Sequence, residues 1–147
     1  MIGQAIGETL FDILYLGSVI TFGIIMLKKS KAWDQYRLFG LMAVVLGAGD
    51  SFHLVPRCVA LWENDMAGNA PYLGLGKLIT SITMTVFYVL LFYVYRSRYH
   101  VQGKRWLDAM TWFFAFARVI LCCFPQNEWF SAKPPLDWGI YRNIPFA

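Results

Sequence analysis

Charged residues are scarce in this chain of 147 residues, and their scarcity excludes an ordinary water-soluble domain. Only 15% of the residues are charged, whereas 58% are hydrophobic. Soluble domains carry roughly 25% charged and 45–50% apolar residues, so this chain has too little polar surface to cover a globule in water. The formal net charge of +4 does not indicate a nucleic-acid partner, because the basic residues cluster between apolar runs, as a membrane topology signal does.

Motifs of common enzymes are also absent. The sequence has no Ser/His/Asp triad, phosphate-binding glycine loop or Cys-x-x-Cys motif. Its two histidines are too few for a usual zinc site of three or four ligands, and we predict no metal and no cofactor. Three cysteines, Cys58, Cys122 and Cys123, fall near the ends of apolar runs. The sequence is compatible with two alternatives, an outer disulfide from Cys58 to one of the other two cysteines or buried free thiols.

Long apolar runs are what the sequence has in place of these features. Four runs are long enough to cross a bilayer as helices, at residues 9–27, 38–55, 73–95 and 107–124. The runs are continuous, which disfavours a β-barrel, and Pro56 and Pro125 follow the second and fourth. No basic residue precedes Thr9, so the first run is not a signal peptide. We predict one all-α transmembrane domain over residues 1–147, a four-span bundle of antiparallel neighbours with a tail over 125–147.

Basic residues alternate between the loops and predict the orientation. The first and third loops each carry four Lys or Arg, the second loop carries only Arg57, and the tail carries Lys133 and Arg142. Loops rich in Lys and Arg stay in the cytoplasm. We therefore expect a multi-pass protein of the cell membrane with its N-terminus, second loop and tail outside.

Ionisable residues within the runs mark the candidate site, because each is costly in the bilayer unless paired or hydrated. By helical rise they fall in the outer half of the membrane. Their three- and four-residue spacings place them on shared helix faces. We predict a polar cavity open to the outside, lined by Asp12, Asp50, His53, Lys77, Ser81 and Arg118.

Asp50 and Arg118 have similar depths and are the expected ion pair. The pair would fix the second helix against the fourth, or Arg118 would hold an anionic group. His53 is open as a ligand, a proton carrier or a hydrogen-bonded core residue, and His100 lies in a loop that cannot reach it. Glu8 and Lys77 are close enough to the membrane–water interface for their charged ends to extend toward it.

Three stretches resemble an uncharacterised family of bacterial multi-pass membrane proteins: Gly49–Arg57 (GDSFHLVPR), Pro125–Trp129 (PQNEW) and Tyr141–Phe146 (YRNIPF). The resemblance runs along the whole chain and implies about seven helices but no activity. This chain would be the first four helices, with a fifth beginning at Ile144.

The sequence leaves three functions open. The first is binding or passage of a small polar or anionic molecule through the outer cavity. The second is a membrane-embedded, metal-dependent hydrolase to which Asp50, Ser51 and His53 contribute, and the third is a structural or assembly role. The expected partners are the lipid bilayer, a small-molecule ligand, and further helices or a second copy, with no nucleic acid.

Overall fold

The computed structural model describes residues 2–30, 34–101 and 103–146, which are largely helical and contain no strand. Its elements are α1 (Ile2–Lys29), α2 (Gln35–Glu63), α3 (Ala70–Tyr99), α4 (Arg105–Cys123), the 3-10 turn η1 (Pro125–Asn127), α5 (Leu136–Tyr141) and the 3-10 turn η2 (Ile144–Phe146). In the part described, α1 to α4 are long and apolar enough to cross a membrane. The predicted all-α fold with four membrane-length helices is confirmed.

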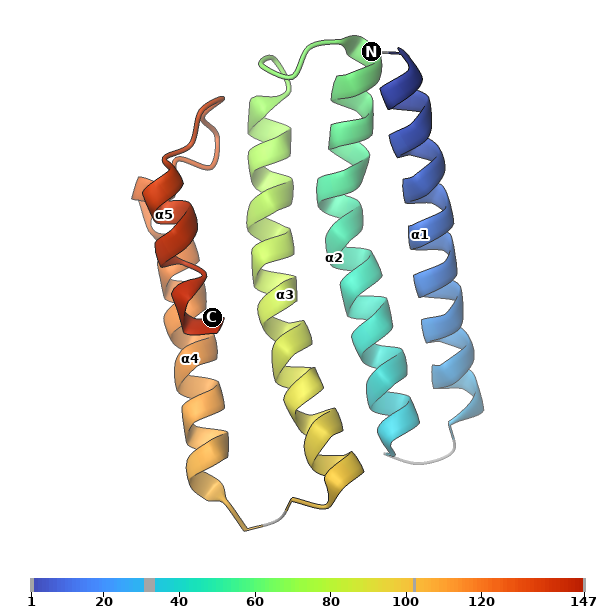
Figure 1. Cartoon of the computed structure of the whole chain (residues 1–147), viewed down its shortest axis with the longest axis vertical. Helices are drawn as coiled ribbons and strands as arrows, with labels where there is room; N and C mark the ends of the chain where they lie inside the picture. Colours follow the sequence, from blue (N-terminus) through green and yellow to red (C-terminus); the bar gives the residue numbers. More distant parts are fainter. Residues whose placement is uncertain (1, 31–33, 102, 147) are drawn as a thin grey trace.

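The four long helices lie side by side in one antiparallel row, in the order of the sequence (Figure 1). α2 packs against both α1 and α3, and α3 makes a smaller contact with α4. The prediction that consecutive helices are antiparallel neighbours is therefore confirmed. α1 and α3 begin, and α2 and α4 end, at one end of the row, which we call the N-terminal end. The other end, which we call the basic end, carries both of the basic loops.

Proline does not end the second helix, which extends beyond the apolar run over 38–55. α2 continues through Pro56 to Glu63. Pro56 has no N–H to bond the carbonyl of Phe52, four residues earlier. That carbonyl is the atom nearest to the position that a Cβ on Gly76 of α3 would take. The close approach of α3 covers the released carbonyl, as neighbouring helices do around proline in membranes.

Glycines set the packing of α1 against α2. A Cβ on Gly40 would lie 2.9 Å from the carbonyl oxygen of Gly23 and 3.0 Å from the backbone nitrogen of Leu27. The two backbones are therefore in contact at this crossing, which side chains would prevent. A Cβ on Gly47 would lie 2.6 Å from the Ile20 side chain, and a Cβ on Gly49 would clash with the Thr83 side chain of α3. Gly40, Gly47 and Gly49 of α2 are therefore points of close approach to the neighbouring helices.

The segment after α4 folds back along that helix (Figure 1). α5 packs through Trp138, whose ring stacks on Phe124 at a centroid distance of 5.6 Å. Ile144–Phe146, where a fifth helix was expected to begin, form η2, and η2 contacts α4. The tail therefore covers part of α4.

Candidate functional site

A ladder of polar contacts joins α1 to α2 in the N-terminal half of the row. Glu8 forms an ion pair with Arg57 at 2.8 Å, and a second hydrogen bond joins the same two side chains at 3.2 Å. One helical turn further along α1, the Cys58 thiol donates to Oδ2 of Asp12 at 3.1 Å. Residues four apart on one helix share a face, so successive turns of α1 present their polar side chains to α2. The predicted polar stripes on the first two helices do face each other.

Two further contacts complete this ladder. The Tyr15 hydroxyl donates to Oδ2 of Asp50 at 2.8 Å, and Nε1 of Trp62 donates to the Thr9 hydroxyl at 3.0 Å. Asp50 is thus satisfied from α1. A hydrogen bond to a charged group contributes about 1.5–3 kcal/mol, so the bonds to Asp50 and Glu8 favour this register of α1 on α2.

His53 of α2 and Lys77 of α3 lie at the contact between these two helices, beside the polar ladder. Nδ1 of His53 is buried and has no hydrogen-bond partner among the described residues. The charged groups that act on its ring come from three helices, namely Asp12, Asp50, Arg57 and Lys77. Lys77 itself is exposed. The structure thus brings Asp12, Asp50, His53 and Lys77 into one electrostatic neighbourhood.

Ser81 does not present its hydroxyl to this neighbourhood. Its Oγ donates to the carbonyl of Lys77 at 2.8 Å, within α3. Thr85, one turn further on, likewise donates to the carbonyl of Ser81 at 2.9 Å. The polar stripe predicted on the third helix is therefore largely satisfied by its own backbone.

Arg118 lies apart from the other predicted residues, and the predicted ion pair with Asp50 is absent from the described residues. Arg118 is only 7% exposed. It donates to the Asn143 side chain at 3.0 Å and to the Thr85 hydroxyl at 3.4 Å. The reason is the row itself: α3 stands between α2 and α4. Similar depth in the membrane therefore did not bring the two charges together.

The tail contributes a cluster that the sequence did not predict. Asn127 is fully buried and donates to the carbonyls of Leu121 and Phe124 at 2.7 and 2.9 Å. It accepts from Arg142 at 3.1 Å, and the Arg142 guanidinium lies 4.2 Å above the Trp129 ring. These residues belong to the PQNEW and YRN stretches, which carry the family resemblance in the sequence. Their mutual contact depends on the fold of the tail.

A groove opens between α1 and α2 beside the ladder. Its volume is about 420 Å³, within the range of small-molecule sites. The groove is lined by Thr9, Asp12, Ile13, Leu16, Val55, Cys58, Val59, Trp62 and Glu63. Asp12 forms the floor and is 8% exposed. Its Oδ2 accepts from Cys58, and its Oδ1 accepts no hydrogen bond in the described part of the chain, which leaves an acceptor for a ligand in the groove.

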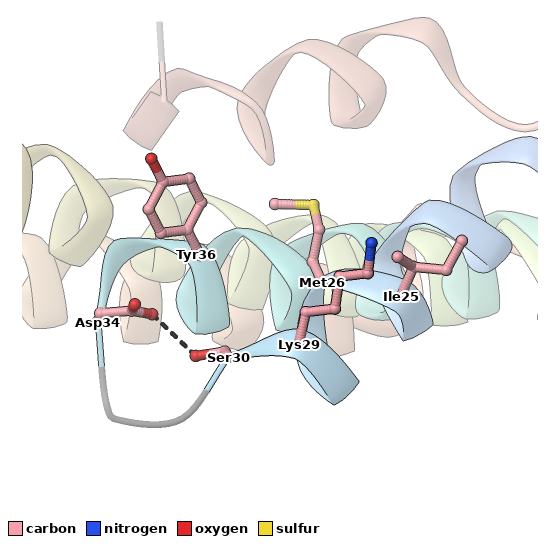
Figure 2. Close-up of a pocket in the computed structure, with 6 residues that line it drawn as sticks. All are labelled: Ile25, Met26, Lys29, Ser30, Asp34 and Tyr36. Carbon is pink, nitrogen blue, oxygen red and sulfur yellow. Dashed lines mark hydrogen bonds between the residues drawn. The ribbon is translucent and has the colours of Figure 1, made fainter.

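A second hollow lies at the basic end, between α1 and the start of α2 (Figure 2). Its volume is about 470 Å³, and its walls include Met26, Lys29 and Tyr36. The Asp34 carboxylate there accepts from the Ser30 hydroxyl at 2.9 Å and from the Arg37 backbone N–H at 3.0 Å. These bonds cap α2 and hold the pKa of Asp34 below its usual 3.8, the backbone N–H of Arg37 contributing most. The polar group of this hollow therefore has a structural task already.

Ser51, which the hydrolase alternative invokes beside Asp50 and His53, bonds within its own helix. The Ser51 hydroxyl donates to the carbonyl of Ala48 at 2.6 Å. Within residues 2–30, 34–101 and 103–146, no three His, Cys, Asp or Glu side chains gather as metal ligands would. The three cysteines are free thiols, with Cys122 buried and Cys123 exposed.

Comparisons with protein-family models, with curated proteins and with solved structures found no match to this chain. Any function assigned to the chain therefore rests on the geometry of its own residues.

Proposed function

We propose that this protein is a multi-pass membrane protein that binds a small molecule within the bilayer, in the groove between α1 and α2. The observation that carries the proposal is Asp12, a carboxylate that is 8% exposed and lies at the floor of a largely apolar groove. A buried ionisable residue in a membrane helix is costly. Its free acceptor borders a volume suited to a ligand, and a ligand would recover part of that cost.

In this proposal the groove takes the place of the outward-opening polar cavity that the sequence suggested. A row of four helices has no central space, and the groove opens on the side of the row instead. Its walls include the apolar side chains of Ile13, Leu16, Val55 and Val59. Binding from the lipid phase fits this geometry better than passage through a pore.

The same proposal includes an orientation. Lys28, Lys29, Arg96, Arg98 and Arg105 all lie at the basic end of the row, in the last turns of α1 and α3 and the first turn of α4. The tendency of Lys and Arg to stay in the cytoplasm favours a cytoplasmic basic end. The mouth of the groove, at Trp62 and Glu63, is then on the outer side of the cell membrane. The bacterial multi-pass family indicated by Gly49–Arg57 belongs to this proposal too, and it assigns no activity.

Photolabelling tests the groove. The probe is 3-trifluoromethyl-3-phenyldiazirine, a small apolar molecule that inserts into whatever surrounds it when illuminated. We expect Val59→Trp, which fills the groove, to lower the label at Ile13 severalfold. Ile24→Trp is the matched control, because Ile24 is 41% exposed on α1 and lies outside the groove. Equal labelling of the two variants would refute the binding groove.

Assembly with other membrane helices is a second candidate, favoured by the outer face of α1. A Cβ on Gly3, Gly7 or Gly17 would meet nothing within 4 Å, unlike Gly23, Gly40, Gly47 and Gly49 in the helix contacts. Small residues let membrane helices approach closely. Gly7→Leu would then lower the mass of the detergent-solubilised assembly measured by light scattering. An unchanged mass would count against this role.

A further inference from the structure

The ionisable side chains that line the groove are acidic. Asp12 lies at its floor and Glu63 at its mouth, and no Lys or Arg is among its described lining residues. The guanidinium of Arg57, next to Cys58 on α2, is held by Glu8 at 2.8 Å. A site with this charge disfavours the anionic ligand that Arg118 had suggested.

Trp62 gives the groove an aromatic wall. The residue is 56% exposed, and its indole N–H donates to the Thr9 hydroxyl across the two helices. This bond fixes the indole in the lining that it shares with Asp12 and Glu63. Tryptophan is the best side chain for cation–π contacts, and such contacts recognise organic ammonium groups in particular.

The rest of the lining excludes a bare metal ion. Ile13, Leu16, Val55 and Val59 supply apolar surface, whereas Ca²⁺ needs six to eight oxygen ligands and Mg²⁺ an octahedral oxygen shell. The lining suits an apolar body with one positive end.

We propose that the ligand of the α1–α2 groove is an organic cation with an apolar body, such as an alkylated amine. Its ammonium group lies against Trp62 between Asp12 and Glu63, and its body lies along the apolar walls. This inference rests on the proposed function and names the class of ligand for the same site.

Two probes of nearly the same shape test the charge. Trimethylphenylammonium carries a positive charge, and tert-butylbenzene is its neutral counterpart. Each probe competes with the diazirine for the groove. Protection is measured as the loss of label at Ile13 and Val59, normalised to the label at Ile24. Membrane partitioning of each probe is measured separately. We expect the cation to protect at a lower membrane concentration than the neutral probe.

Matched variants test which carboxylates favour the cation over the neutral probe. Glu63→Gln and Asp12→Asn should each raise the half-protecting concentration of the cation about five- to tenfold and leave that of tert-butylbenzene unchanged. Asp65→Asn, in the exposed loop after α2, removes a charge at the same end and should change neither. Glu63 is exposed, so Glu63→Gln should fold and still tests the effect of the charge if Asp12→Asn fails to fold.

The two kinds of failure are distinguishable. If tert-butylbenzene protects as well as the cation, or if neither acidic variant affects the cation, the ligand class is wrong and the groove stands. If the groove takes up no label in excess of Ile24, the proposed function itself is wrong.

Discussion

The contact between Gly40 and Gly23 provides a sharp test of the close packing of α1 against α2. A Cβ at residue 40 would lie 2.9 Å from the Gly23 carbonyl oxygen, about 0.5 Å closer than ordinary contact begins at 3.4 Å. Because the neighbours include backbone atoms of α1, the two helices must separate to admit it. Overpacking of this kind costs about 1–3 kcal/mol. The better helix propensity of alanine returns up to about 1 kcal/mol, so Gly40→Ala should destabilise by about 1 kcal/mol.

Gly17→Ala is the matched control on the partner helix. A Cβ at Gly17 meets nothing within 4 Å, so only the gain in propensity applies and the variant should be up to about 1 kcal/mol more stable. The free energy of unfolding is measured by titrating each detergent-solubilised variant with a denaturing detergent. The reasoning would be refuted if Gly40→Ala proved as stable as Gly17→Ala.

Three other predictions rest on the same structure. In a double-mutant cycle, Asp50→Asn and Arg118→Gln should destabilise additively within about 0.5 kcal/mol, and a larger coupling energy would mean that the two side chains pair after all. The stability contributed by the Asp34 cap is present above pH 3.8 and lost as pH falls through the lower pKa of the folded state. The melting temperature of the wild type should therefore fall relative to Asp34→Asn between about pH 5 and about pH 2; a constant difference would contradict the cap. In a chain without its three cysteines, Ala67→Cys should react with an impermeant maleimide in intact cells and Lys104→Cys only after permeabilisation, and the reverse pattern would overturn the orientation.

The long helices were predictable because hydrophobic length is a local property. Runs of apolar residues report membrane-length helices directly, and only the ends moved. The second helix continues through Pro56, whose effect depends on α3. The Phe52 carbonyl that it releases is covered by the close approach at Gly76, which the sequence of α2 alone does not contain.

The candidate site was predictable only where the partners lie on adjacent helices. Spacing along α1 and α2 was enough to predict that Asp12 and Asp50 lie on polar faces of their helices. The same reasoning was wrong for Arg118, because two residues at equal depth in the membrane need not lie on neighbouring helices. Its contact with Asn143 needs a tail that folds back on α4, and no periodicity in the sequence predicts that.

The distribution of photolabel along α1 and α2 of the unmodified protein in lipid bilayers tests the groove most directly. Ile13 and Val59 line the groove and are 65% and 45% exposed, whereas Phe22 and Ile24 are 64% and 41% exposed outside it. Peptide mass spectrometry after illumination with the diazirine compares the two pairs at similar exposure. A groove that holds small molecules predicts severalfold more label at Ile13 and Val59, and equal label at all four residues would contradict it.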